Sequence, residues 1–125
     1  MSFAERRKYP RIAESVSCQV SLGAEKFQTL TKNLSCGGAL CSLAEPMAPM
    51  TKLDLVLDLP AVPGAVAASR QTVRCVGVVV RQDRLPLEEH AYLTAIYFAD
   101  LKPEDRRRIG EFILQSMFSH DRRRS

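Results

Sequence analysis

Residues 53–59 read Leu53-Asp54-Leu55-Val56-Leu57-Asp58-Leu59, and they set the class of the domain. Leucine stands at every second position. Successive side chains of an extended chain point to opposite faces, so this alternation predicts a β-strand with one face in a core. The two aspartates share the other face, where the sequence offers no partner that would make them an acid–base pair. Other stretches of the sequence show the same period of two.

Five further strands are expected on either side of this one. They are Val16–Leu22, Phe27–Lys32, Ala39–Leu43, the valine-rich Thr72–Arg81 and Tyr92–Phe98. A turn at Gly23-Ala24-Glu25 separates the first two strands, and the alternation in the second is imperfect. Gly77 within the long strand indicates a bend or bulge, which closed sheets need. Pro60–Ala68 and Asp83–His90 are predicted loops.

One helix is predicted after the last strand. Pro103 stands where a first helical residue belongs, with Glu104 and Asp105 in the first turn. Apolar or small residues follow at helical spacing, and this face is expected to consist of Ile109, Phe112, Ile113, Ser116 and Met117. Phe118 lies just beside it. About six strands followed by one helix predict an antiparallel barrel or sandwich with the helix covering one end.

The composition fits one globular domain. A chain of 125 residues can bury roughly two thirds of its unfolded surface, so it needs no disulfide or metal to fold. No apolar run approaches the ~20 residues that a membrane span requires. Charged residues begin at Glu5, so we expect no secretory leader and a cytoplasmic location.

Cysteines and histidines give no sign of a metal site. The cysteines stand at positions 18, 36, 41 and 75, without C-x-x-C spacing. Cys18 and Cys75 alternate with valines, which favours a place in the core and a reducing compartment. His90 and His120 stand near no cysteine, so zinc is not expected.

Basic residues are concentrated at the two ends of the chain. Residues 1–11 have a net charge of +3 and residues 119–125 of +2, whereas the whole chain has +4. The body is therefore close to neutral. This distribution favours anion capture by a basic arm, predicted over residues 1–13, rather than by a basic face of the body at 14–118. Residues 119–125 are expected to form a frayed basic tail.

Two polar segments carry the candidate chemistry. The first contains Arg6, Arg7 and Arg11, and the second runs from Asn33 through Ser35 to the pair Gly37-Gly38. A guanidinium group matches a phosphate, or the O6/N7 edge of guanine, with two parallel hydrogen bonds. The asparagine and serine offer donors and acceptors to a base, and the glycines allow positive φ and close approach to a flat ligand.

These two segments resemble the signature of the PilZ domain family, bacterial receptors for cyclic di-GMP. Residues 7–11 form an R-x-x-x-R run and residues 33–38 a (D/N)-x-S-x-x-G run. Each run is weak evidence alone, but both occur in the family's order with its strand pattern and Pro-initiated helix. The resemblance covers nearly the whole chain and implies a six-stranded antiparallel β-barrel with a C-terminal helix.

The resemblance also implies a ligand site. Arg7 and Arg11 would bind phosphate and guanine, with Arg6 as a further phosphate contact. Asn33, Ser35, Gly37 and Gly38 would contact the guanine from the barrel. The sequence departs from the family pattern at Ala95, where many relatives have glycine, and at Lys102, where a serine-type cap is usual. Arg81 is the nearest candidate where some relatives place a stacking aromatic.

The expected function is that of a single-domain cyclic di-GMP receptor and adaptor. Ligand binding would order the arm and change contact with a downstream protein, which the sequence does not name. One alternative is a protein-interaction module of the same fold, of the pilus or flagellar assembly type, that binds no nucleotide. Another is a nucleic-acid-binding barrel, disfavoured because the body is near-neutral and its eight aromatics, as a set, are not interleaved with the basic residues. Catalytic motifs and a cofactor fingerprint are lacking, so no enzyme is expected.

Overall fold

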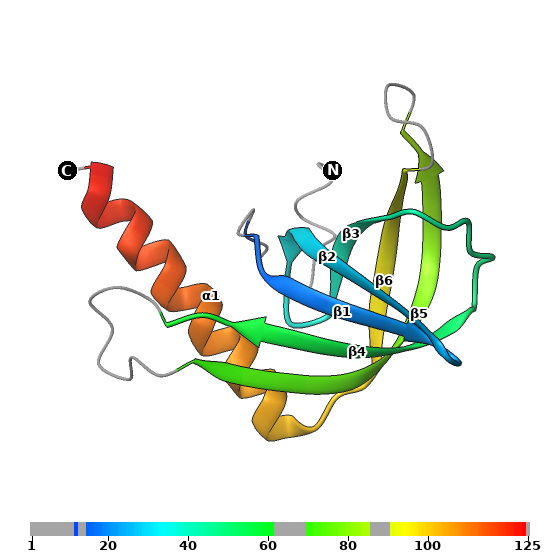
Figure 1. Ribbon diagram of the computed structural model, residues 1–125. Helices are drawn as coiled ribbons and strands as arrows, with labels where there is room; N and C mark the ends of the chain where they lie inside the picture. Colours follow the sequence, from blue (N-terminus) through cyan, green and yellow to red (C-terminus); the bar gives the residue numbers. More distant parts are fainter. Residues whose placement is uncertain (1–11, 13–14, 62–69, 86–90, 125) are drawn as a thin grey trace, which may run out of the picture.

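The computed structural model describes residues 12, 15–61, 70–85 and 91–124, with side chains up to Phe118. Within these ranges the chain forms six strands and then one helix (Figure 1). The elements are β1 (Ser17–Leu22), β2 (Glu25–Leu34), β3 (Gly38–Leu43), β4 (Lys52–Leu59), β5 (Gln71–Arg84), β6 (Tyr92–Asp100) and α1 (Pro103–Arg124).

The six strands close into an antiparallel barrel in the order β1-β2-β3-β6-β5-β4. Pairing of β1 with β4 completes the ring and brings Cys18 opposite Leu57. Closure leaves no unpaired strand edge. The barrel is therefore confirmed, and the sandwich that the strand count also allowed is excluded.

The interior is filled by alternate residues of each strand. All four leucines of β4 are buried, as the alternation in residues 53–59 predicts. Cys18 and Cys41 also lie in this core, whereas Cys75 packs against it while partly exposed. The core reading of Cys18 is thus confirmed and that of Cys75 holds in part.

Bulges explain the irregular strands. The register of β2 with β3 shifts between Thr31 and Asn33, so that Leu34 rather than Asn33 is buried beyond Thr31. In β5 the register with β6 shifts beside Gly77 and again before Arg81. The bend or bulge predicted at Gly77 is confirmed by this register shift. An added Cβ there would lie 2.5 Å from Cγ2 of Ile96, so a larger residue would have to displace neighbouring core side chains.

Several predicted boundaries change. Glu25 belongs to β2 rather than to the preceding turn. Asn33 lies within β2 and Gly38 begins β3, so the polar turn is confined to residues 35–37. Leu30 is 56% exposed, because it faces outward opposite Ser17. The long strand continues to Arg84, beyond the predicted end at Arg81.

The helix begins at Pro103 as predicted, with the amide of Arg106 donating to the carbonyl of Lys102 at 2.9 Å. Ile109, Phe112 and Ile113 are buried against the end of the barrel. Met117 was expected on this face, but it is 43% exposed because it lies around the side of the helix. The predicted frayed tail is helical as far as Arg124.

Some expectations fall outside the described residues. They include the arm up to Arg11, most of the loop Pro60–Ala68 and the side chains of the two histidines. Within the described residues, no helix combines the length and the apolar character needed to cross a lipid bilayer.

Candidate functional site

The turn between β2 and β3 is shaped by the side chain of Ser35. Its Oγ accepts hydrogen bonds from the amides of Gly37 and Gly38 at 3.1 and 3.2 Å. The Ser35 amide donates to the carbonyl of Gly38 at 2.9 Å. Ser35 is itself buried, so its hydroxyl group mainly holds the turn in shape. A direct contact of Ser35 with ligand stays a prediction.

The same turn is fixed to β6 by the two glycines. The amide of Phe98 donates to the carbonyl of Gly37 at 2.9 Å. A Cβ added at Gly38 would overlap the Ile96 carbonyl oxygen and lie 3.3 Å from its carbon. Gly38 does not have positive φ, contrary to the sequence expectation. Glycine is needed here because the backbones of β3 and β6 approach closely.

Asn33 stands immediately before this turn with an unused acceptor. Its Oδ1 is buried and has no hydrogen-bond partner among the described residues. A buried polar atom without a partner is unfavourable, because it has lost its water without gaining a protein donor. Oδ1 of Asn33 is therefore a place where a ligand N–H group can be accommodated.

The end of the N-terminal segment is joined to the same point. Ile12 and Leu34 exchange two backbone hydrogen bonds, of 3.0 and 2.9 Å, outside the named strands. Leu34 lies between Asn33 and Ser35 in the sequence. Residue 12 was expected to belong to a free arm, but its backbone is fixed to β2. Ile12, which directly follows Arg11 in the sequence, is thus attached beside the motif turn.

Strand register places further residues beside this turn. One row across the sheet consists of Asn33, Leu40, Ala95 and Arg81. The next row consists of Gly38, Tyr97 and Val78. We call these seven residues the shelf. Since neighbouring strands lie ~4.8 Å apart, the four-residue row spans roughly 14 Å.

The middle of the shelf is apolar and includes one exposed aromatic ring. Tyr97 is 56% exposed and stands in register with Gly38, which presents no side chain. Ala95 and Leu40 continue the apolar surface toward Asn33. A flat surface of this kind suits stacking of a purine base, which every aromatic ring can support.

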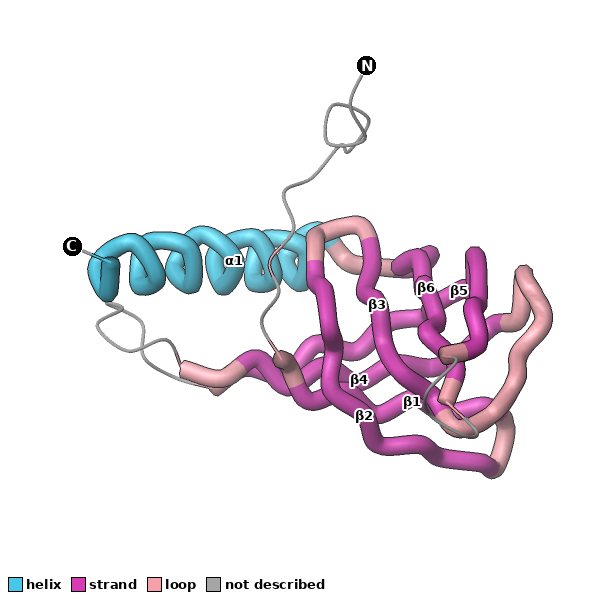
Figure 2. Tube along the Cα trace, turned by 90° about the horizontal axis from the view of Figure 1, so that it is seen from above, coloured by secondary structure: helices cyan, strands magenta, loops and turns pink. Residues whose placement is uncertain are grey.

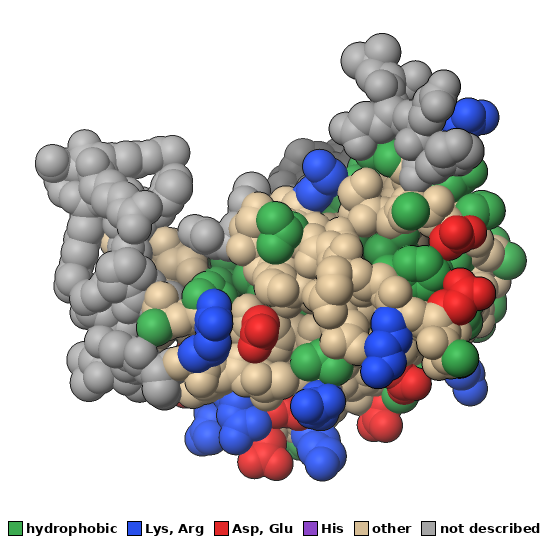
Figure 3. Space-filling model, in the orientation of Figure 1, with side chains coloured by type: hydrophobic (Ala, Val, Ile, Leu, Met, Phe, Trp, Pro, Cys, Tyr) green, Lys and Arg blue, Asp and Glu red, His purple; other side chains and the backbone are tan. Residues whose placement is uncertain are grey.

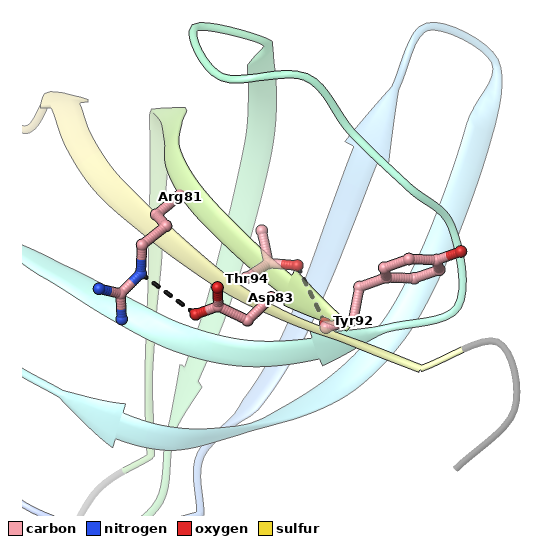
Figure 4. Close-up of polar contacts among 4 residues, drawn as sticks. All are labelled: Arg81, Asp83, Tyr92 and Thr94. Atoms are coloured by element: carbon pink, nitrogen blue, oxygen red, sulfur yellow. Dashed lines mark hydrogen bonds and ion pairs between the residues drawn. The ribbon is translucent and has the colours of Figure 1, made fainter. Parts of the chain in front are cut away.

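Arg81 lies at the far edge of the shelf from Asn33. Its Nε pairs with Oδ2 of Asp83 at 3.2 Å, and both side chains are mostly exposed (Figure 4). An exposed ion pair of this kind contributes little to the free energy of unfolding, about 0–1 kcal/mol. An anionic ligand could therefore displace Asp83. Nearby, Oγ1 of Thr94 donates to the carbonyl of Tyr92 at 3.1 Å and holds the start of β6.

Cys36 connects the motif turn with α1. Its Sγ lies 3.7 Å from the carbonyl oxygen of Arg106, and a Cβ added at Gly110 would be 3.4 Å from it. Burial raises the pKa of the Cys36 thiol, while the positive charge of Arg106 opposes this effect. The thiol is therefore protonated at neutral pH and is a poor nucleophile.

The structure thus brings together part of the predicted site. Asn33, Ser35, Gly37 and Gly38 form one continuous corner, and Arg81 lies three strands away in the same row. Arg6, Arg7 and Arg11 lie outside the described residues. Tyr97, Leu40 and Ala95 were not predicted as site residues. Only the alternation of the last strand could have shown that Tyr97 faces outward.

The chemistry of this surface is that of binding. It offers an unused carbonyl acceptor, an apolar floor and an edge guanidinium group. Among the described residues, no cluster of histidine, cysteine or acidic side chains could hold a metal ion. On the face drawn in Figure 3, basic and acidic side chains interleave rather than form one basic patch. Fold and site together define a small β-barrel module whose outer surface presents groups suited to holding a flat ligand.

Comparison with known proteins places this module in a family. The family model of the PilZ domain matches residues 5–115. The chain belongs to the PilZ domain family. The matched range includes both sequence motifs and continues into α1. No curated protein gives a significant match.

Solved structures share the fold. The inhibitor of motility MotI/DgrA of Bacillus subtilis has 21% identity and a TM-score of 0.75, covering 90% of this chain and 51% of its own. The PilZ domain of YcgR from Escherichia coli, solved with c-di-GMP, has 16% identity and a TM-score of 0.70, and the match covers 95% of this chain and 96% of the YcgR domain. MrkH of K. pneumonia, in its complex with c-di-GMP, has 20% identity and a TM-score of 0.67, and the match covers 94% of this chain and 55% of MrkH.

The three neighbours differ in how much of their own length this chain covers. The chain spans about half the length of MotI and MrkH, but nearly all of the YcgR domain. At such low identity the likeness shows the fold. It does not by itself show a ligand or a partner of this chain.

Proposed function

We propose that this protein is a receptor for cyclic di-GMP that acts in the cytoplasm as an adaptor. The ligand would lie on the shelf and be held from above by Arg6, Arg7 and Arg11. The observation that carries the proposal is the double hydrogen bond between Ile12 and Leu34. It attaches the arginine-bearing segment beside Asn33, so both halves of the motif can reach one ligand. The comparisons add that YcgR and MrkH were solved with this nucleotide.

The chemistry of guanine fits the unused acceptor. Guanine presents N1–H and N2–H₂ donors on one edge, and Oδ1 of Asn33 is a buried oxygen without a donor. Adenine has no N1–H and no 2-amino group, so a base held in the same position would present no donor to this oxygen from that edge; its one amino group, at C6, lies elsewhere on the ring. The phosphates would be taken by the guanidinium groups, whose planar forks match phosphate oxygens.

The expected affinity is moderate. Ordering about six residues of the arm costs on the order of 10 kcal/mol. Bidentate arginine–guanine pairs contribute ~1–3 kcal/mol each, and the phosphate contacts add to this. Because the cost of ordering the arm nearly balances the gain from these contacts, we predict a dissociation constant of roughly 1 µM, which corresponds to a binding free energy of about −8 kcal/mol. Added salt should weaken binding, because much of the attraction is between charges.

The change in the arm is the proposed output. When the arginines close over the ligand, the surface around residues 1–13 changes shape and charge. A protein partner that recognises one of the two surfaces would sense the nucleotide. The role is therefore binding and relay, without bond-making chemistry.

Isothermal titration calorimetry tests this proposal. Wild type should bind cyclic di-GMP and should bind cyclic di-AMP at least about 100-fold more weakly. The double variant Arg7→Ala/Arg11→Ala should lose most of its affinity for cyclic di-GMP. Asn33→Ala should bind the nucleotide about tenfold more weakly than wild type. Arg74→Ala is the matched control, because Arg74 is an exposed arginine at the other end of β5. The stoichiometry distinguishes one bound nucleotide from a stacked pair.

Two results would overturn the proposal. Wild type that takes up no cyclic di-GMP at about 1 mM would favour the nucleotide-independent interaction module. Equal affinities of wild type and the double arginine variant would show that the nucleotide binds elsewhere.

A further inference from the structure

Arg81 faces the shelf because β5 has one extra residue directly before it. The register of β5 with β6 shifts between Val79 and Arg81, which sets Arg81 opposite Ala95. An unshifted register would set it opposite Thr94, whose side chain is fully buried. The bulge therefore turns a charged side chain from the core to the outer surface.

Gln82 holds this bulge in place. Its Nε2 donates to Oγ1 of Thr94 at 2.9 Å and to the carbonyl of Glu45 at 3.1 Å, and its Oε1 accepts the amide of Met47 at 2.8 Å. Gln82 thus takes the inward place that an unshifted strand would give to Arg81. These hydrogen bonds fix the backbone next to Arg81, so Arg81 can change its contacts by rotating its side chain alone.

The Arg81 side chain leans away from the centre of the shelf. Its Nε lies 3.2 Å from Oδ2 of Asp83 (Figure 4). Asp83 stands opposite Leu93, whereas Tyr97 lies on the other side of Ala95 along β6. The ion pair therefore draws the guanidinium group toward Leu93 and away from the exposed Tyr97 ring.

A different direction of the same side chain would reach the shelf. Arg81 and Tyr97 are diagonal neighbours on the outer face, because Tyr97 stands two residues from Ala95, the strand partner of Arg81. Diagonal positions of this kind are ~7–8 Å apart, within reach of long side chains. A guanidinium group turned that way could bond to the acceptor groups of a nucleotide whose base stacks on Tyr97.

We propose that Asp83 lowers the affinity of the shelf for cyclic di-GMP by holding Arg81 away from it. The nucleotide must take the guanidinium group from Asp83, so the two acceptors compete for one cation. Both side chains are mostly exposed, at 71% and 59%, which keeps the pair weak enough to exchange. Asp83 is thus a positioning residue that acts through Arg81. This inference rests on the proposed function and adds a residue that sets how much nucleotide the protein needs.

The ion pair can be altered without disturbing the rest of the fold. Figures 1 and 2 show the ends of β5 and β6, where the pair lies, at the other side of the barrel from α1. Asp83 is exposed, and its register with Leu93 depends on backbone pairing rather than on its side chain. Replacing the side chain should therefore change ligand binding and leave folding unchanged.

Calorimetric titration of cyclic di-GMP into wild type, Asp83→Asn, Arg81→Ala and the double variant tests the proposal. Asp83→Asn should bind about threefold more tightly than wild type, because Arg81 no longer has a competing acceptor. Arg81→Ala should bind about tenfold more weakly than wild type. In the double variant, Asp83→Asn should bring no further change, because Asp83 acts through Arg81.

Two controls separate this contact from the effects of charge and folding. Asp54→Asn removes the same charge from an exposed aspartate on β4, whose strand partners Ser21 and Val76 lie outside the shelf, and it should bind like wild type. Asp83→Glu keeps a carboxylate within reach of Arg81, so its affinity should stay within about twofold of wild type. Urea unfolding should give nearly the same midpoint for every variant.

The outcomes distinguish this inference from the proposed function. A wild type that takes up no cyclic di-GMP overturns the proposed function, and this inference with it. Where wild type binds, an Asp83→Asn variant that binds no more tightly overturns this inference alone. So does an equal gain in affinity with and without Arg81, since Asp83 would then repel the nucleotide directly.

Discussion

Replacing Gly38 with alanine separates the structural role of this motif residue from its role toward a ligand. The added Cβ would overlap the carbonyl oxygen of Ile96 and lie 3.4 Å from Cα of Tyr97. These are backbone atoms within a paired strand, so they cannot rotate away as a side chain would. An ordinary carbon–oxygen contact needs ~3.3 Å, which requires β3 and β6 to separate by about 1 Å.

The cost follows from what this separation disturbs. The hydrogen bond from the amide of Phe98 to Gly37 and the bond from Ser35 to Gly38 are both 2.9 Å long. Weakening the two costs about 0.5–1.5 kcal/mol each, and the remaining overlap costs about 1–3 kcal/mol. We expect Gly38→Ala to lower the free energy of unfolding by about 3 kcal/mol. For a domain of this size that corresponds to a fall in Tm of roughly 10–15 °C.

Urea unfolding followed by far-ultraviolet circular dichroism measures this change, since the chain contains no tryptophan. Gly110→Ala is the matched control: its Cβ would make only an ordinary contact with Sγ of Cys36 at 3.4 Å. In a helix this exchange should stabilise the protein by about 0.5–1 kcal/mol. If both variants unfold at the same urea concentration, the close backbone approach does not explain why glycine occupies position 38.

Three further predictions concern single side chains. Thr31→Val should lower the free energy of unfolding by about 1–3 kcal/mol, because Thr31 Oγ1 accepts the buried amide of Val16 at 3.0 Å; urea unfolding measures this, and an unchanged midpoint would contradict it. Tyr97→Ser should weaken the binding of cyclic di-GMP about tenfold in calorimetry, whereas Tyr97→Phe should bind nearly as wild type does. If the serine variant binds as tightly as wild type, the Tyr97 ring is not part of the site. Burial, together with nearby thiol and carboxyl groups, raises the pKa of Cys75 from 9.0 to about 12. The Cys75 thiol of the unfolded chain therefore ionises at lower pH than that of the folded chain, so the free energy of unfolding is highest below pH 9.0 and falls as pH rises toward 12. We expect a fall of about 1–2 kcal/mol, less than the full shift implies, because the thiol is partly exposed to solvent. Cys75→Val should flatten this alkaline loss in urea titrations at several pH values.

The secondary structure was largely predictable because burial on one side of a strand imposes a period of two. The leucines of β4 all point inward, as their alternation indicates. The period failed at the bulge between Thr31 and Asn33, where one extra residue changes the face of everything beyond it. Local alternation cannot show where a partner strand will force such an extra residue.

The candidate site was predictable where its residues are adjacent in sequence. Asn33 to Gly38 form one corner because the turn is short and closed by its own serine. The approach of β6 to Gly38 and the place of Tyr97 beside it depend on pairing between strands more than fifty residues apart in the sequence. That pairing also turned the expected role of Gly38 from positive φ to close packing. The arginine residues 6, 7 and 11 lie outside the described residues, and their role stays a prediction.

The helix shows the same division. Spacing identified its buried face, and Pro103 identified its start. Met117 follows the apolar spacing equally well, yet it is exposed because the barrel end covers only part of the helix surface. The extent of a covering surface is a property of the assembled barrel.

The sequence by itself determined the strands, the helix start and the motif corner, because these follow from the alternation and turn chemistry of neighbouring residues. Tertiary structure alone decided that the sheet closes through β1 and β4, that Ile12 joins Leu34, and that the shelf forms across four strands. The physical reason is that hydrogen bonds between strands and the burial of shared surface depend on which distant segments meet, and a local pattern contains no record of that choice.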